Sequence, residues 1–166
     1  MDFKIIQSFE ELAVKCEKWR LIEKRIVLTI GCFDLLHGGH VRYLSEAKKY
    51  GDKLIVGIKS DDLVRAIKGE GRPIRDAVDR AIVIAGFSCV DLVMISNQDE
   101  DLINTVLPDV YVASKTTHTR IGEDQRCFNL LKSIGSDIIE LNAKSDFYST
   151  TKIVDKILVL HNLQFP

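Results

Sequence analysis

The sequence predicts an α/β fold in which five parallel strands alternate with helices. Short runs rich in Val, Ile and Leu recur along the chain, each of a length suited to one strand with both faces buried. Between these runs, apolar residues return at the spacing of an amphipathic helix. Strands that alternate with helices favour parallel pairing, so we expect a doubly wound sheet with helices on both faces.

Each predicted strand is a short apolar run. The first, R-I-V-L-T-I, leads directly into a glycine-containing turn, and the second is K-L-I-V-G-I-K. Both runs are apolar without alternation, which is typical of strands that are covered on both sides. The expected strands are residues 25–30, 53–59, 91–95, 109–113 and 137–141.

Helices are expected between the strands and near both ends of the chain. The first is marked by Ser8, which can act as its N-cap, and by Glu10 and Glu11 in its first turn. A loop with the sequence K-G-E-G-R-P, residues 68–73, breaks regular structure. The expected helices are residues 8–24, 39–50, 61–67, 76–87, 100–106, 122–134 and 149–160.

Length and composition indicate one domain, residues 1–166, that begins with an N-terminal helical segment, residues 1–24. The chain has 166 residues, of which 46% are hydrophobic and 28% are charged, enough apolar material for a core. The formal net charge of −1 gives no basic excess, so we expect no nucleic-acid partner.

The distribution of apolar residues and cysteines favours a cytoplasmic protein without a membrane partner. No apolar run approaches the roughly 18 residues that a membrane span needs, and the N-terminus lacks the apolar part of a signal peptide. The cysteines form no C-x-x-C pair and are typical of reduced thiols. They are Cys16, Cys32, Cys89 and Cys127.

The turn after the first predicted strand carries the clearest chemistry. It has the sequence G-C-F-D-L-L-H-G-G-H, residues 31–40. Its glycines allow a ligand to approach the backbone, and the helix that follows offers free N–H groups to an anion. His37 and His40 are three residues apart and can face one ligand, where an imidazole can donate to a phosphate oxygen, more strongly when protonated.

Other interpretations of this turn are less favoured. Two histidines could be half of a metal site, but no further Cys or His lies at ligand spacing nearby. A dinucleotide site would need G-x-G-x-x-G, which is absent. The histidines could also be purely structural, although a glycine-rich helix start favours a ligand-binding role.

The tetrapeptide H-G-G-H, residues 37–40, resembles the H-x-G-H signature of the cytidylyltransferase-like nucleotidyltransferases, which have a Rossmann-like fold. The resemblance extends from about residue 9 to residue 157. It includes V-L-T-I-G-C-F-D-L-L-H-G-G-H-V, L-I-V-G-I-K-S-D, K-G-E-G-R-P-I, D-R, V-D, L-P-D-V and S-T-T-K-I, in this order. The set is most similar to the heptose-1-phosphate adenylyltransferase branch, whereas glycerol-3-phosphate cytidylyltransferases share fewer of its pieces.

The resemblance implies catalytic roles for His37, His40 and Lys48. The histidines would bind the triphosphate and stabilise the transition state, and Lys48 would reach the phosphates from the following helix. The implied nucleotide-binding residues are Gly31, Cys32, Phe33, Asp34, Gly39, Arg80, Ser149, Thr150 and Thr151. From the residues alone, Lys48 is equally typical of a solvated helix surface, and S-T-T of an ordinary helix N-cap.

The resemblance further implies transfer of a nucleoside monophosphate, AMP from ATP in this branch, to a sugar phosphate such as heptose 1-phosphate. The acceptor oxygen attacks the α-phosphorus and pyrophosphate leaves, so catalysis needs positioning and charge stabilisation rather than a protein nucleophile. Mg²⁺ is the expected cofactor, bound mainly through the nucleotide phosphates, and a homodimer is the expected assembly. The alternatives are a cytidylyltransferase for glycerol 3-phosphate or another polyol phosphate, and a catalytically silent nucleotide-binding module.

The acceptor site is expected in two loops. Lys68 and Arg72 flank glycines in the K-G-E-G-R-P loop, where they can bind a phosphate or remain solvated. After the fourth predicted strand this branch usually carries a K-G-G-D-Y-like segment, whereas this chain reads A-S-K-T-T-H. We expect Lys115 and His118 in that segment to contact the acceptor, because ligands bind at the carboxyl ends of parallel strands. The alternative is a polar surface loop.

Overall fold

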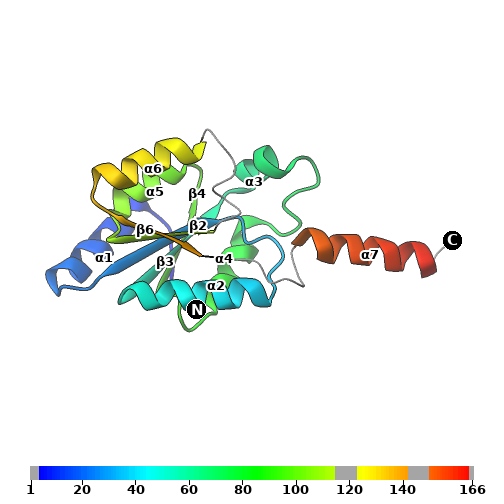
Figure 1. The fold of residues 1–166 in the computed structure, drawn as a ribbon, viewed down its shortest axis with the longest axis horizontal. Helices are drawn as coiled ribbons and strands as arrows, with labels where there is room; N and C mark the ends of the chain where they lie inside the picture. The colour runs from blue at the N-terminus through cyan, green and yellow to red at the C-terminus, as the bar shows by residue number, and fades with distance from the viewer. Residues whose placement is uncertain (1–3, 115–122, 142–149, 165–166) are drawn as a thin grey trace.

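Six parallel strands form one sheet in the order β1–β4–β3–β2–β5–β6, with helices on both faces (Figure 1). This computed structural model describes residues 4–114, 123–141 and 150–164. Within those ranges, no helix combines the length and apolarity that crossing a bilayer requires.

The strands are β1 (Ile5–Ile6), β2 (Ile26–Gly31), β3 (Lys53–Lys59), β4 (Leu92–Ser96), β5 (Val110–Ser114) and β6 (Asp137–Leu141). The helices are α1 (Phe9–Leu21), α2 (Gly38–Ala47), the 3-10 turn η2 (Lys48–Tyr50), α3 (Asp61–Lys68), α4 (Ala77–Ala85), α5 (Asp99–Val106), α6 (Glu123–Ser133) and α7 (Thr150–Gln164).

The predicted α/β fold with a parallel sheet is confirmed, and the five predicted strands lie where they were expected. The structure adds one edge strand, β1, so the predicted number of strands was wrong by one. In this strand Ile5 pairs with Val93, and Ile6 pairs with Met94. Two residues are too few to show a strand periodicity, which is why the sequence pattern did not reveal β1.

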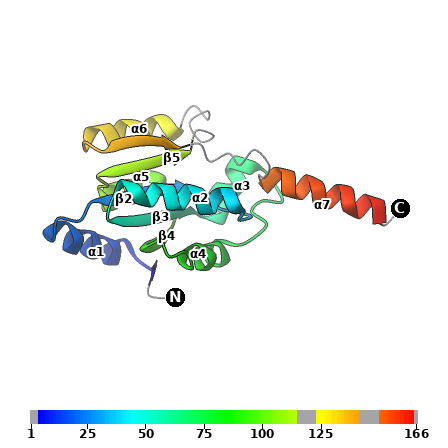
Figure 2. The ribbon, with the colours of Figure 1, turned by 60° about the horizontal axis from the view of Figure 1, so that its bottom comes forward.

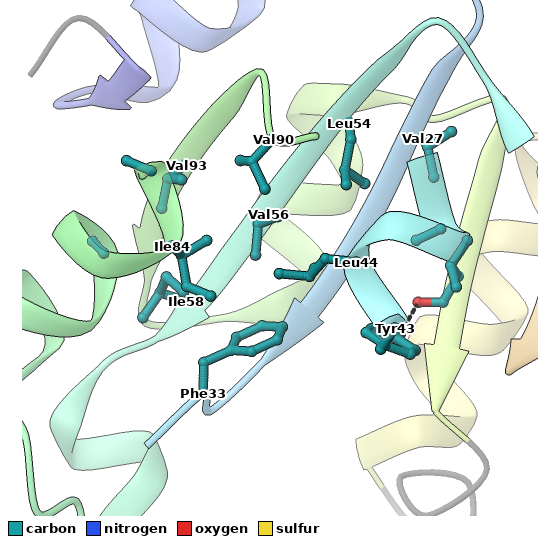
Figure 3. Close-up of a cluster of buried hydrophobic side chains, with 14 of the residues drawn as sticks. Val27, Phe33, Tyr43, Leu44, Leu54, Val56, Ile58, Ile84, Val90 and Val93 are labelled. Atoms are coloured by element: carbon teal, nitrogen blue, oxygen red, sulfur yellow. Dashed lines mark hydrogen bonds between the residues drawn. The ribbon is translucent and has the colours of Figure 1, made fainter. Parts of the chain in front are cut away.

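The sheet separates two apolar cores. Side chains along β3 alternate between them, so Leu54, Val56 and Ile58 face one core and Ile55 faces the other. The first core is closed by α2 and α4, and Figure 3 shows Leu44 of α2 beside strand residues of this core. The second core is closed by α1, α5 and α6. Both faces of the sheet are therefore covered, as the uninterrupted apolar runs predicted.

The chain reverses its direction of winding at β2. From this strand it proceeds to β3 on one side, and it later returns to place β5 on the other side. Ligands of doubly wound sheets bind outside the carboxyl ends of the strands at such a switch point. The turn that follows β2 begins at Gly31 and leads into α2, so it lies at this position.

A buried hydroxyl chain fastens α2 to both strands at the switch point. Tyr43 Oη lies 2.8 Å from Thr29 Oγ1 of β2 and donates to Val112 O of β5 at 2.9 Å. Because the tyrosine proton is used on Val112, the Thr29 hydroxyl donates to Tyr43. Burial raises the pKa of Tyr43 to about 12, so its hydroxyl keeps the proton that this contact needs.

Gly51 lies between η2 and β3, and its substitution tests the packing at the amino-terminal ends of the strands. A Cβ at this position would lie 2.7 Å from both Arg25 O and Val27 Cγ2. We expect Gly51→Ala to lower the free energy of unfolding by about 1–3 kcal/mol, since the backbone at Arg25 would have to shift. Urea denaturation measures this loss.

Gly38→Ala is the matched control for that experiment. A Cβ at Gly38 meets no atom of the described residues within 4 Å, so the free energy of unfolding of Gly38→Ala should stay close to that of wild type. Equal losses in the two variants would contradict the packing argument.

Candidate active site

A tight turn joins β2 to α2. Gly31 has no room for a side chain, because an added Cβ would lie 2.8 Å from Phe33 Cε2. Phe33 adopts a positive φ of 46° and keeps only 6% of its surface exposed. The glycine therefore lets the Phe33 ring fold back against the strand end, and the backbone of residues 31–37 can turn directly into the helix.

The two histidines are built into the start of α2. His37 is the N-cap residue, and its Nδ1 accepts a hydrogen bond from the Gly39 N–H at 3.1 Å. His40 Nδ1 accepts from the backbone N–H of His37 at 3.3 Å. The ring centroids lie 4.0 Å apart. Since Nδ1 is an acceptor in both rings, each neutral ring carries its proton on Nε2, and that N–H remains as a donor for a ligand.

This reciprocal arrangement is a capping box in which histidines take the places of the usual Ser and Glu. The sequence favoured ligand binding by His37 and His40 over a purely structural role, and it did not predict that they also cap the helix. A three-residue spacing across a helix start is the signal that could have indicated it. The cap orients both imidazoles before any ligand binds.

Burial keeps both histidines neutral near pH 7. It lowers the pKa of His37, and it lowers the pKa of His40 to about 4, with smaller contributions from the charges of His37 and Lys68. The donors of the unliganded site are therefore neutral Nε2–H groups, rather than imidazolium ions. Lys68 is the last residue of α3, and its charge is one of the causes that lower the pKa of His40.

Asp34 connects the histidine turn to the K-G-E-G-R-P loop. Its carboxylate is buried and accepts from Arg72 Nη1 at 2.6 Å and from Ile74 N at 2.8 Å. Burial alone would raise the pKa of Asp34, but these hydrogen bonds, with one from Arg75 N, hold it below its usual value. Arg72 thus points into the protein toward Asp34, and the pair holds the loop beside the turn.

Arg80 lies below the turn as a buried structural cation. Its side chain is 0% exposed, and Nη2 donates to Lys59 O at 2.9 Å and to Asp61 Oδ1 at 2.6 Å. Nη1 donates to Cys32 O, and Nε donates to the loop backbone. All of its nitrogens are engaged, so the structure does not place Arg80 as a direct nucleotide ligand. It acts as a positioning residue that joins the ends of β2 and β3.

Lys48 lies at the opposite end of α2 from the histidines. Its Nζ donates to Asp91 Oδ2 and to Asp52 O, each at 2.5 Å. Asp91 directly precedes β4 and Asp52 directly precedes β3, so this cluster lies at the amino-terminal ends of the strands. The prediction that Lys48 reaches the phosphates disagrees with this placement, because the length of the helix separates it from the turn.

The start of α7 meets the histidine turn. Thr150 Oγ1 donates to Leu35 O at 3.3 Å, and the helix then runs away from the sheet (Figures 1 and 2). This contact brings the start of α7 to the turn, and the contact of the S-T-T residues with nucleotide phosphates stays a prediction. Lys115, His118 and Ser149 lie outside the described residues, as does the side chain of Thr151.

The resulting site combines two imidazole donors with a helix N-terminus at the switch point of a parallel sheet, an arrangement suited to a phosphate ligand. Residues 28–156 match the cytidylyltransferase-like family, and the chain belongs to this family of nucleotidyltransferases. The resemblance inferred from the H-G-G-H segment is thereby confirmed.

The curated relatives are longer proteins. The bifunctional protein HldE of Geobacter metallireducens is 43% identical over 157 residues, which are 92% of this chain and 31% of that protein. HldE of Campylobacter jejuni subsp. jejuni serotype O:2 is 39% identical over 163 residues, 95% of this chain and 32% of the relative. This chain thus spans about a third of the length of these relatives.

A solved structure shares the fold. It is the crystal structure of the lipopolysaccharide core biosynthesis protein from Thermoplasma volcanium, with a TM-score of 0.61 and 25% sequence identity. The match covers 72% of this chain and 97% of that one.

The low pKa of His40 predicts how stability depends on pH. The unfolded chain binds a proton at the ordinary histidine pKa of 6.5, whereas the folded chain binds it only at about 4. The stabilising contribution is therefore complete above pH 6.5 and is lost as the pH falls toward 4. Thermal unfolding of the unliganded protein should show a melting temperature that falls over this range.

His40→Asn is the variant for this test. Asn Oδ1 can replace Nδ1 as the acceptor for the His37 N–H, but Asn does not titrate. The melting temperature of the variant should fall less steeply with decreasing pH than that of wild type. Parallel curves for the two proteins would exclude His40 as the source of the dependence.

Proposed function

We propose that this chain transfers AMP from ATP to a sugar phosphate such as heptose 1-phosphate and releases pyrophosphate. The observation that carries the proposal is the pair of Nε2–H donors fixed by the capping box at the start of α2. Two neighbouring imidazole donors at a helix N-terminus suit the triphosphate of a nucleotide.

The reaction is an in-line displacement at the α-phosphorus. A phosphate oxygen of the acceptor forms the new P–O bond, and the bond between the α-phosphorus and the bridging oxygen to the β-phosphate breaks. Negative charge moves onto the leaving pyrophosphate. The Nε2–H groups of His37 and His40 donate to phosphate oxygens as this charge develops, and the ammonium group of Lys68 adds positive charge nearby.

Neutral histidines suit this task. A neutral Nε2–H can bind a phosphate oxygen without first taking up a proton, and a bound polyanion raises the pKa of the ring by favouring its charged form. The site can therefore strengthen its hydrogen bonds as negative charge accumulates. No protein nucleophile is required, because the acceptor itself supplies the attacking oxygen.

The relatives support the choice of nucleotide and acceptor. The resemblance to the heptose-1-phosphate adenylyltransferase branch agrees with the HldE proteins being 39–43% identical. The Thermoplasma volcanium protein is a lipopolysaccharide core biosynthesis protein, and a saccharide product agrees with a sugar phosphate as the acceptor. We extend from these relatives to this chain only the nucleotidyl transfer, because the chain covers about a third of the HldE proteins.

A panel assay of pyrophosphate release tests the proposal. ATP, CTP and GTP are each combined with heptose 1-phosphate, glycerol 3-phosphate and ribitol 5-phosphate. We expect release with ATP and heptose 1-phosphate. Release with CTP and a polyol phosphate would replace the proposal by the cytidylyltransferase alternative, and nucleotide binding without any release would indicate a silent binding module.

His40→Asn should lower kcat in this assay by about 10²–10³-fold, the loss expected for one preorganised donor in the transition state. The variant keeps the acceptor of the capping box, so its folding should be close to wild type at neutral pH. His40→Gln places an amide near the position of Nε2 and should retain more activity than His40→Asn.

Lys48→Met is a matched control for the histidine variants. The ammonium group of Lys48 pairs with Asp91 at the amino-terminal ends of the strands, away from the histidines. Loss of this ammonium group should therefore change kcat and KM little. A large fall in kcat for Lys48→Met would contradict the placement of the site.

Mg²⁺ is proposed to act with the nucleotide, where it neutralises charge on the phosphates. Within residues 4–114, 123–141 and 150–164, no group of three or more His, Cys, Asp or Glu side chains could hold a metal ion. The phosphate oxygens are therefore the proposed ligands. EDTA should abolish turnover and leave the melting temperature unchanged, and excess Mg²⁺ should restore turnover. A lowered melting temperature would point to a structural metal instead.

A further inference from the structure

A cleft of about 340 Å³ opens at the carboxyl ends of β3 and β4, on the face of the sheet that carries α5 and α6. It lies beside the strand that leads into the histidine turn but is lined by other residues. Its polar lining consists of Lys59, Asn97, Gln98, Asp99, Glu100 and Arg126. Volumes in this range hold small organic ligands.

The charges of this lining cancel. Lys59 forms an ion pair with Asp99, and Arg126 lies 3.7 Å from Glu100. The remaining polar groups are the amides of Asn97 and Gln98, which both donate and accept. A phosphate would require cations that are not already matched by carboxylates. Such a neutral, mixed lining suits hydroxyl groups, which also donate and accept.

Asp99 has a buried acceptor that lacks a donor among the described residues. Its Oδ2 accepts from Lys59 Nζ, whereas no hydrogen bond from the described part of the chain reaches Oδ1, although that atom is buried. A buried carboxylate oxygen without a donor costs free energy, so a small rotation of the Asp99 side chain, which keeps 17% of its surface exposed, toward a ligand hydroxyl would be favourable. The Lys59 side chain is only 11% exposed, so its ion pair holds the Asp99 carboxylate at the cleft.

Arg80 connects the cleft to the histidine turn. One guanidinium donates both to Cys32 O, at the start of the turn, and to Lys59 O, at the cleft. The two sites thus lie at the ends of adjacent strands, with Gly31 opposite Ile58 in the register. A phosphorylated polyol can reach both if its phosphate points toward the histidines.

We propose that this cleft binds the hydroxylated carbon chain of the acceptor, with the Asp99 carboxylate accepting hydrogen bonds from its hydroxyl groups. The phosphate of the same molecule then lies near the α-phosphorus at the histidine turn. This inference rests on the proposed function, and it adds the residues that select a polyhydroxylated acceptor. Lys59 is the positioning residue for Asp99.

Asp99→Asn tests the role of the carboxylate. The amide oxygen can still accept from Lys59, so folding should be retained, but the charged acceptor for the ligand is lost. We expect KM for heptose 1-phosphate to rise about ten- to a hundredfold, as for the loss of hydrogen bonds to a charged group, with KM for ATP nearly unchanged. Asp101→Asn, an exposed change of the same charge in the first turn of α5, is the control and should leave both values unchanged.

Binding without turnover provides the second measurement. Heptose 1-phosphate is titrated into ¹⁵N-labelled wild-type protein, and the side-chain amide signals of Asn97 and Gln98 are followed by NMR. We expect these signals to shift with heptose 1-phosphate and to shift much less in Asp99→Asn.

The outcomes separate the two proposals. If the wild type releases pyrophosphate while Asp99→Asn behaves like Asp101→Asn, the cleft is not the acceptor site and the proposed function stands. If no pyrophosphate is released but the amide signals shift, the sugar site stands and the proposed transfer fails. An absence of both responses overturns both.

Discussion

The position of the active-site turn depends on one buried cation, Arg80. Its guanidinium donates to the backbone of the turn after β2, to the end of β3 and to the loop before α4, and it pairs with Asp61 at the start of α3. A buried charge is costly unless it is paired and hydrogen-bonded, so these partners also keep Arg80 in place. Three chain segments, at residues 32, 59–61 and 75–80, are thereby held together at the carboxyl ends of the strands.

Asp34 is the acidic counterpart of this arrangement. It anchors the loop that contains Arg72 from the other side of the turn, again with a buried charge and backbone donors. The histidines are therefore carried by a backbone that is fixed by two ionic contacts, while their rings are oriented by the helix cap. The histidine rings, which we propose as the donors to the ligand, are neutral near pH 7 in the unliganded site, and the charges that position them are buried.

Much of the fold could be predicted from the sequence, because apolar runs and helical spacing report burial directly. Leu54 to Ile58 are apolar since both faces of β3 are covered, and that pattern identifies the strand. The strand Ile5–Ile6 could not be found in this way, because two residues have no period. The glycine-rich turn with His37 and His40 was recognisable for a physical reason as well, since both its spacing and its place after a strand are local.

Roles that depend on tertiary contacts could not be predicted. Lys48 is eleven positions beyond His37, and at about 1.5 Å per residue a helix carries it far from the turn. The Arg80 side chain is buried because its guanidinium donates to carbonyl groups of three segments. No sequence pattern indicates this convergence. The cleft around Asp99 could not be predicted for the same reason, since its lining comes from β3, α3, α6 and the segment 97–100.

The hydroxyl chain at Tyr43 has a consequence for the energetics of ligand binding. The hydrogen bonds of Tyr43 attach α2 to β2 and β5, so the position of the helix against the sheet is fixed before any nucleotide binds. Ligand binding therefore does not have to order the donors, and the entropy that a flexible phosphate loop would lose is already lost during folding. The Tyr43 side chain thus fixes during folding the helix that carries the two histidines.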